Sequence, residues 1–314
     1  MVCFYKEAMK MTEVSQTVFN KYQVRKSKKQ KTEFIRYLQS QIPQLQVQTG
    51  GFPKNRNLVI GDPDNARVIL GAHYDTCAQL PLPNFITPKR PMVAIGYSVL
   101  LILPYLLIVL LLNLILKQFS LAPDVHYLIS IVSYGLFMML FLTGPANKHT
   151  ANDNTSGVIT LLELYHQMDD ADKDGVCFVL FDNEEKGLLG SGYFRKKHKK
   201  AIKNALMINF DCVSDGDHFL IAVSKKATQK YHVPIARSYT ATQKKQVLVE
   251  SLKRVYYPSD QAGFPQAIAI ASLNHKKPFG YYMDRIHTKH DTIFQEENIR
   301  YLVERTQQLI GSIH

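Results

Sequence analysis

Seven histidine and acidic residues follow apolar segments of this 314-residue chain, and their side chains suit a metal centre. They are His73, Asp75, Asp153, Glu184, Glu185, Asp211 and His287. Zinc takes imidazole nitrogen and carboxylate oxygen as ligands. Two zinc ions about 3.5–4 Å apart need one bridging carboxylate and two further ligands each. Five of the residues match that count: His73, Asp153, Glu185, Asp211 and His287.

The two remaining acidic residues fit supporting roles in such a centre. Glu184 stands beside the expected ligand Glu185, so it would face a bridging water and act as general base. Asp75 follows His73 by two positions, so both side chains would share a strand face and the carboxylate would orient the imidazole. Each residue alone is weakly diagnostic, because an aspartate before a helix, such as Asp153, is often an N-cap. Their order along the chain favours the metal centre.

These residues lie between segments that alternate between helix and strand patterns. Strands are expected at 58–60, 68–72, 175–182, 205–211 and 266–273, and helices at 32–42, 156–168, 190–202 and 296–313. The first two strands, joined by the turn sequence 62–65, are expected to pair as a hairpin. The alternation predicts an α/β fold, a three-layer sandwich around a mixed, mostly parallel sheet. Sites in such sheets lie at the carboxyl ends of the strands, where the candidate residues stand.

Two runs without any charged residue interrupt this pattern, at 91–116 and 125–147. Each provides the roughly 20 apolar residues that a helix needs to cross a bilayer. With the short connector 117–124 they predict a transmembrane helical hairpin inserted at 91–147. Pro104 and Asn113 are compatible with such a helix, since helix neighbours can satisfy freed backbone groups. The alternative is a pair of buried core helices, but neither run shows the usual polar stripe.

The charges beside the hairpin predict its orientation. Lys89, Arg90 and Lys148 flank it, whereas the connector has one lysine that is offset by an aspartate. The positive-inside rule therefore predicts an integral membrane protein whose catalytic domain is cytoplasmic. Cys77 and Cys212 adjoin expected ligands, which suits a reducing compartment. Residues 1–16 lack the apolar stretch of a signal peptide.

Basic residues exceed acidic ones by 38 to 26 and gather at 25–31, 195–200 and 225–254. Such a surface suits nucleic acid, anionic lipid or an acidic substrate, while solvated helix faces explain any single cluster equally well. No nucleic-acid partner is expected, because no recognisable nucleic-acid module accompanies the clusters. The lipid bilayer is the partner that the apolar runs predict. The stretch 225–254 is expected to cover the site as a lid or to face lipid.

Five motifs carry a resemblance to a known family: "GAHYDT", "NDNTSGV", "FDNEEKGLLGS", "NFD" and "IHTKHDT". They stand in the order found in metallopeptidase family 28, the co-catalytic di-zinc exopeptidases of the bacterial leucyl-aminopeptidase type, and the similarity spans roughly 30–80 and 149–312. The resemblance implies a zinc aminopeptidase-like fold. Its catalytic domain would be discontinuous, with residues 1–87 and 149–314 interrupted by the hairpin, where typical members have a short loop.

The resemblance also implies a role for each residue. His73 and Asp211 would bind one zinc ion, Glu185 and His287 the other, with Asp153 bridging, Glu184 as base and Asp75 as the partner of His73. The motif "YPSDQAGF" at 257–264 resembles a segment near the family's site. Asp260 is therefore a weaker substrate-binding candidate, although a turn-forming aspartate explains it equally well. Asp291 is expected to be structural.

The predicted activity is that of a membrane-anchored, zinc-dependent aminopeptidase. Two zinc ions would activate a bridging water, Glu184 would take its proton, and substrates would be peptides with a free N-terminus. A mono-zinc glutaminyl cyclase of the same fold is an alternative that metal stoichiometry separates, and a carboxypeptidase or aminoacyl-amide hydrolase is separated by substrate profiling. A non-catalytic membrane scaffold is a third, disfavoured because the ligands and base are all present. The sequence leaves the oligomeric state, the side-chain preference and the metal used in the cell open.

Overall fold

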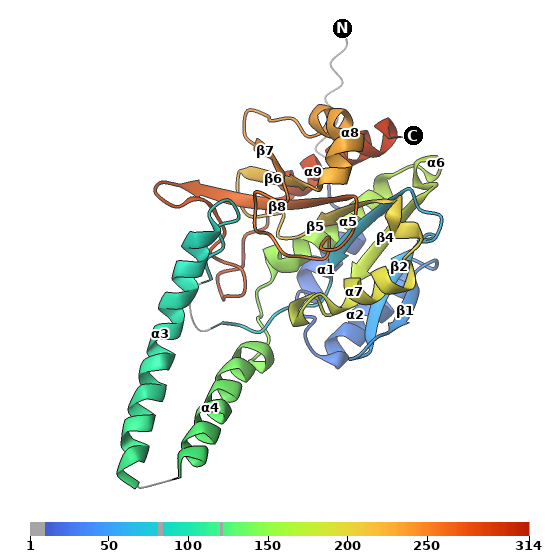
Figure 1. Cartoon of the computed structure of the whole chain (residues 1–314). Coiled ribbons are helices and arrows are strands. Elements are labelled where there is room, and N and C mark those ends of the chain that lie inside the picture. Colours follow the sequence, from blue (N-terminus) through green and yellow to red (C-terminus); the bar gives the residue numbers. More distant parts are fainter. Residues whose placement is uncertain (1–9, 81–83, 120–121, 314) are drawn as a thin grey trace.

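A nine-stranded sheet forms the centre of the computed structural model, which describes residues 10–80, 84–119 and 122–313 (Figure 1). The strand order is β1-β2-β4-β3-β5-β8-β6-β7, and β9 pairs with β8. The strands are β1 Gln46–Gly50, β2 Asn55–Ile60, β3 Val68–His73, β4 Val176–Phe181, β5 Leu206–Phe210, β6 His218–Val223, β7 Gln246–Ser251, β8 Ala267–Lys276 and β9 Gly280–Tyr282. Most of the segment that carries the signal-peptide prediction, residues 1–9, lies outside the described residues.

The central strands β4, β3, β5 and β8 are parallel neighbours. Antiparallel pairings flank them, β2 with β4 and β6 with β8. Every residue of β3 is buried, as expected for a strand that is covered on both faces. The predicted mixed sheet with a mostly parallel centre is confirmed. It brings the carboxyl ends of β3, β4 and β5 to one edge.

The hairpin predicted between the segments 58–60 and 68–72, which form β2 and β3, is wrong. Leu58–Ile60 of β2 pairs antiparallel with Phe178–Leu180 of β4, and β3 pairs in parallel with β4 and β5. Strand β4 therefore lies between β2 and β3, although it follows them by more than a hundred residues in the chain. The local turn sequence 62–65 indicated a reversal of direction correctly, but a strand buried on both faces takes its partners from distant segments. The hairpin that does form is β1 with β2.

Two layers of helices cover the sheet, and alternate strand residues face each layer. Val176, Phe178 and Leu180 join a core with helices α1, α2, α5, α8 and α9, whereas Cys177 and Val179 join a second core with α7. This alternation is the period of two that a strand imposes. The helices are α1 Glu13–Lys21, α2 Lys28–Gln41, α5 Gly157–Gln167, α6 Asp170–Lys173, α7 Leu189–Lys197, α8 Lys225–Ser238 and α9 Glu296–Ser312. The predicted three-layer arrangement follows from these contacts.

The two apolar runs form helices α3, Pro91–Leu116, and α4, Pro123–Thr143. Figure 1 shows them as a pair that leaves the α/β body on the side away from both termini. Within the part of the chain that the structure describes, α3 alone is long and apolar enough to cross a membrane, and its most apolar window has no buried residue. That exposure excludes a buried core helix for α3. The second run ends as a helix at Thr143 rather than extending to Asn147.

Contacts between α3 and α4 hold the pair together. The Asn113 side-chain amide donates a hydrogen bond to the Ser130 hydroxyl at 3.3 Å, and the rings of Tyr105 and Tyr134 lie 6.3 Å apart. Asn113 also donates to the carbonyl of Val109 in its own helix. The polar group that interrupts the first apolar run is therefore hydrogen-bonded both within α3 and to α4.

The basic stretch 225–254 is built into the helix layer and the sheet, which contradicts its expected role as a lid over the site. Helix α8 packs on the sheet through Ala227, Tyr231 and Ile235, next to α9. Strand β7 continues the sheet by pairing in parallel with β6. Ala227, Tyr231 and Ile235 stand four residues apart and are buried, so the lysines and arginines of α8 belong to a helix that packs on the sheet. The lid prediction is wrong for residues 225–238.

Candidate metal centre

The sheet edge brings the candidate residues together from five segments of the chain. His73 is the last residue of β3, Glu184 and Glu185 follow β4, and Asp211 follows β5. Asp153 lies in the irregular turn that precedes α5, and His287 lies in the loop after β9. His73, Glu184, Glu185 and Asp211 were predicted as site residues because they follow apolar strands. Since β3, β4 and β5 are parallel, these strands end at the same edge of the sheet and bring the four residues together.

Asp153 lies between the two histidines. Its Oδ1 is 3.3 Å from His73 Nε2, and its Oδ2 is 2.8 Å from His287 Nε2. On one side His73 Nε2 is also 3.5 Å from Asp211 Oδ1, and on the other His287 Nε2 is 3.4 Å from Glu185 Oε2. Each oxygen of one carboxylate thus faces a different group of ligand atoms, which is the arrangement that a bridge between two metal ions requires.

Asp75 acts on both halves of this cluster, though not only as predicted. Its backbone carbonyl lies 3.0 Å from His73 Nδ1, which leaves Nε2 directed at Asp153. Its carboxylate is farther from that nitrogen, at 3.7 Å, and accepts hydrogen bonds from the backbone N–H groups of Glu184, at 2.9 Å, and Glu185, at 3.3 Å. Asp75 therefore fixes the turn that presents both glutamates, as well as lying beside the histidine.

Asp291 holds the loop that carries the bridging carboxylate. Its two oxygens accept the backbone N–H groups of Asn152, at 2.7 Å, and Asp153, at 3.0 Å. The structural role expected for Asp291 agrees with these contacts. The Asn152 side chain in turn accepts from the backbone N–H of Ser214, at 2.8 Å, and ties the loop to the segment after Asp211.

Arg25 is a supporting residue that the sequence reading missed. It is fully buried, its Nε donates to the carbonyl of Tyr74, and its Nη1 lies 3.1 Å from the Thr155 hydroxyl. Burial lowers the pKa of Arg25 to about 10, although Asp75 and Asp153 act to raise it. The cluster 25–31 was open to a reading as a solvated basic face, and nothing in its local pattern distinguishes this arginine from its neighbours.

Burial and mutual charge perturb the pKa values across the cluster. Burial raises the pKa of Glu184 well above its ordinary range, and of Glu185 to about 7, with nearby histidines opposing both shifts. Burial alone would lower the pKa of His287, but Glu185 and Asp153 raise it to about 10. Burial would raise the pKa of Asp153, yet the histidines lower it overall. So many buried charges in contact are what a metal ion neutralises.

The ligand atoms also fit metal binding by their spacing. Oxygen and nitrogen atoms of His73, Asp153 and Asp211 lie within 4.8 Å of one another, and so do ligand atoms of Asp153, Glu185, His287 and Cys77. Among the described residues, Glu185 Oε1 is buried and has no hydrogen-bond partner. A cation between these groups would satisfy it. Hard oxygen and imidazole ligands in this number suit zinc, cobalt or manganese.

Asp260 lies apart from the metal-spaced groups. Its side chain is fully buried, and within the described ranges neither carboxylate oxygen has a hydrogen-bond partner. Burial raises the pKa of Asp260 to about 7, while His73 acts to lower it. The charge of His73 reaches this carboxylate, so Asp260 belongs to the surroundings of the site. Asp260 also stands in the turn that the backbone hydrogen bond from Ala262 to Ser259 closes, so the turn-forming and substrate-binding interpretations both remain open.

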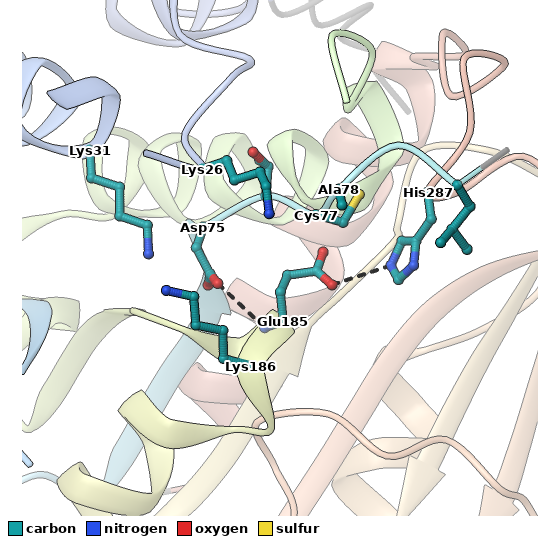
Figure 2. A pocket seen from close by; sticks show the side chains of 10 residues that line it. Lys26, Lys31, Asp75, Cys77, Ala78, Glu185, Lys186 and His287 are labelled. Carbon is teal, nitrogen blue, oxygen red and sulfur yellow. Dashed lines mark hydrogen bonds and ion pairs between the residues drawn. The ribbon is translucent and has the colours of Figure 1, made fainter. Parts of the chain in front are cut away.

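A cavity of about 270 Å³ opens beside the cluster. Glu184, Asp211 and His287 form one wall, and Phe85, Ile86, Tyr257 and Ile286 form an apolar wall. Ala94 and Ser98, from the first two turns of α3, complete the lining. A second cavity shares Glu185 and His287 with the first, and Figure 2 shows it with Lys26, Lys31 and Lys186 around it.

Comparisons with known proteins agree with this geometry. The model of Peptidase family M28 matches residues 135–308, more than half of the chain. A search of curated proteins finds no match. Among solved structures, a Zn-dependent exopeptidase from Parabacteroides distasonis is similar at a TM-score of 0.58 and 15% identity, covering 95% of this chain and 96% of that one.

Two further structures share the fold. The LapA aminopeptidase of Legionella pneumophila has a TM-score of 0.56 and 13% identity, covering 96% of this chain and 68% of that one. The glutaminyl cyclase of Porphyromonas gingivalis has a TM-score of 0.55 and 15% identity, with 95% of both chains covered. At such identities these likenesses concern the fold, and they do not separate a peptidase from a cyclase.

The chain belongs to Peptidase family M28, and the prediction of a metallo-exopeptidase is confirmed. The family match begins within α4, so it includes Asp153, Glu184, Glu185, Asp211 and His287 but not His73. His73 joins them through the parallel pairing of β3 with β4 and β5.

Proposed function

We propose that this chain is a zinc-dependent aminopeptidase of the bacterial leucyl-aminopeptidase type with two zinc ions. The observation that carries the proposal is the position of Asp153, whose two oxygens face His73 and His287 separately. His73 and Asp211 would hold one ion, Glu185 and His287 the other, with Asp153 between them. Bound zinc ions supply an activated water and polarise the substrate carbonyl.

Glu184 is the proton-transfer group in this proposal. It lines the cavity beside His73 and Asp211, and Asp75 fixes its backbone. Its carboxylate would take a proton from the attacking water and return it to the nitrogen of the leaving amine. Burial raises the pKa of this carboxyl well above its ordinary range, which makes it a stronger base toward the attacking water.

The apolar wall of the 270 Å³ cavity suits the first side chain of a peptide. The free α-amine would then lie near the acidic cluster that it complements in charge. Asp260, buried and close enough for its charge to act on His73, is the weaker candidate for a substrate-binding residue.

A glutaminyl cyclase is the second candidate, because a solved cyclase shares the fold as closely as the aminopeptidase does. Two pairs of potential ligands favour the peptidase: His73 with Asp211 on one side of Asp153, and His287 with Glu185 on the other. An enzyme with one metal ion needs only one such pair. Metal content separates these readings. A non-catalytic scaffold is disfavoured, because the proposed base and all five proposed ligands meet at one site.

We further propose that α3 and α4 anchor the enzyme in a membrane. Helix α3 has a mean hydropathy of 3.0 over its best window with its side chains exposed, and large apolar residues of α4, such as Leu128 and Val132, are exposed as well. Such a surface is costly in water. The catalytic domain would comprise 1–87 and 149–314 around the insert 91–147, and the flanking residues Lys89, Arg90 and Lys148 favour a cytoplasmic location for it.

Hydrolysis of aminoacyl chromogenic substrates by the detergent-purified chain, with metal content measured on the same sample, tests the proposal. We expect about two zinc ions per chain and turnover with an unblocked N-terminus only. Glu184→Gln should lower kcat by about 10²–10⁴-fold and retain the metal. One zinc per chain without peptidase activity would transfer the assignment to the cyclase.

A further inference from the structure

A groove of basic side chains leads outward from the proposed metal centre. Its inner part is a cavity of about 210 Å³ that contains Glu185 and His287 and is lined by Lys26, Lys31 and Lys186 (Figure 2). Its outer part, about 410 Å³, shares those three lysines. The basic groove is defined by Lys26, Lys28, Lys31, Lys54, Arg56 and Lys186.

Three carboxylates line the basic groove, and each is already engaged. Asp182 forms a buried ion pair with Lys31. Asp75 accepts two backbone N–H groups, and Glu185 is a proposed metal ligand. The acidic side chains of the groove therefore do not neutralise its outer lysines.

Three of the cations in the basic groove have no acidic partner. No acidic residue within 10–80, 84–119 and 122–313 forms an ion pair with Lys28, Lys54 or Lys186. Lys186 and Lys28 are exposed to solvent at its rim. Like charges gathered in a concave surface raise the local concentration of anions. The groove is thus a ready site for a negatively charged ligand.

We propose that the basic groove binds acidic side chains of the peptide substrate on the carboxyl side of the cleaved bond. The inference rests on the proposed aminopeptidase function and names its substrates: peptides that carry aspartate or glutamate at the third and fourth positions. The apolar cavity would take the first side chain, and the rest of the peptide would leave past Glu185 and His287 along the groove. The continuity of the groove with these residues favours a peptide over anionic lipid.

The test compares two peptides that differ only in charge, Leu-Gly-Glu-Glu-amide and Leu-Gly-Gln-Gln-amide, with the full-length zinc-loaded chain in a neutral detergent. We expect kcat/KM to be about tenfold higher for the acidic peptide at low salt, through KM. The preference should largely vanish at about 0.5 M NaCl, where charges are screened. Lys28→Gln with Lys54→Gln should lower the preference roughly fivefold, chiefly through a higher KM for the acidic peptide.

Lys29→Gln is the matched control, because Lys29 belongs to the same segment but is exposed outside the groove. It should retain the preference of the unmodified chain. Equal kcat/KM for the two peptides at low salt overturns the proposal. A double variant that keeps the preference between the two peptides but binds less tightly to anionic vesicles also overturns it, since that result would assign the groove to lipid.

Binding separates failure of this inference from failure of the proposed function. The Glu184→Gln variant with its metal should bind a fluorescent acidic peptide about tenfold more tightly than the neutral one. If that difference is observed but the unmodified chain hydrolyses neither peptide, the groove stands and the aminopeptidase assignment fails. Equal binding of both peptides contradicts the groove whatever the activity.

Discussion

Buried acidic side chains extend beyond the proposed zinc ligands. Asp260 is fully buried, and burial raises its pKa to about 7. Burial and the charge of Asp153 raise the pKa of Asp291 to about 8, although two backbone N–H groups oppose that shift. Carboxyls of this kind are more easily held as neutral acids in the folded, metal-free chain, so that the metal-free protein should be sensitive to pH.

Removing the metal should therefore make stability fall as the pH rises. A carboxyl with a raised folded-state pKa stabilises the fold below its ordinary pKa, and this contribution is lost as pH rises through the folded value, about 7 for Asp260. We expect the Tm of the EDTA-treated chain to be lower at about pH 8 than at about pH 5. Thermal unfolding in detergent at both pH values measures this.

Asp260→Asn should reduce that difference, because the neutral amide has no proton to lose. The variant should be more stable than the unmodified metal-free chain at the higher pH and similar at the lower. An identical dependence on pH in both chains would show that Asp260 is not the titrating group.

The sequence predicted His73, Glu184, Glu185 and Asp211 because each stands where an apolar strand ends, whereas Asp153 and His287 were recognised from their order along the chain and their motifs. It did not predict Arg25 or the burial of Lys31, which share a charged segment with exposed lysines. Their burial depends on Asp182 and on the carbonyl of Tyr74, contributed by other parts of the chain. The backbone contacts of the Asp75 carboxylate were missed for the same reason, since they join residues more than a hundred positions apart.

At the scale of elements, α3 has two surfaces with different neighbours. Most of its length exposes leucine, isoleucine and valine, whereas Ala94 and Ser98 line the cavity beside the cluster. The segment before α3 is fixed to the loop after β9, which carries His287, because Ile86 and Met283 exchange two backbone hydrogen bonds of 2.8 and 2.9 Å. The start of α3 is therefore positioned by the same loop that carries His287.

Enlarging Ala94 should narrow the cavity. Ala94→Phe is expected to lower kcat/KM roughly tenfold for substrates with a leucine N-terminus and less for alanine, because an added ring takes space that the first side chain needs. Met92→Phe on the same turn is the control, since Met92 is 75% exposed and outside the cavity lining. Equal losses for leucine and alanine substrates in Ala94→Phe would contradict a role in side-chain selection.

Element types were easier to predict than element partners. Helical spacing located α2, α5 and α9, and buried runs located β4, β5 and β8. The partner of β2 was misassigned because a turn between two strands carries no information about a strand inserted later between them. The order of a mixed sheet depends on which faces are buried, and that is set by segments far apart in sequence.

At the scale of the whole molecule, the two chain segments that connect the helix pair to the α/β body pair with each other. Ala78 and Ala146 form an isolated bridge, and Gln79 and Asn147 donate backbone hydrogen bonds across it. Helix α3 has 26 residues and α4 has 21, lengths of about 39 and 32 Å at 1.5 Å per residue. A hydrocarbon core of about 30 Å would leave the first turns of α3 above the bilayer, beside the cavity.

The proposed orientation can be measured by labelling. A membrane-impermeant maleimide applied to intact cells should modify Gln118→Cys, in the connector, and leave Lys199→Cys, on the catalytic domain, unmodified until the cells are lysed. Both positions are exposed, and the described native cysteines are buried. Labelling of Lys199→Cys alone in intact cells would reverse the orientation, and labelling of both would argue against a membrane span.

The contribution of α3 to the cavity also limits how the enzyme can be simplified. A chain shortened by removing residues 91–147, the usual route to a water-soluble form, would lose Ala94 and Ser98 and with them one side of the substrate cavity. It would keep the proposed zinc ligands and base, so it could bind metal normally and still select substrates poorly. If α3 anchors the chain as proposed, anchoring and selectivity would have to evolve together, because a change in the depth of α3 in lipid would move Ala94 and Ser98 in the lining of the cavity.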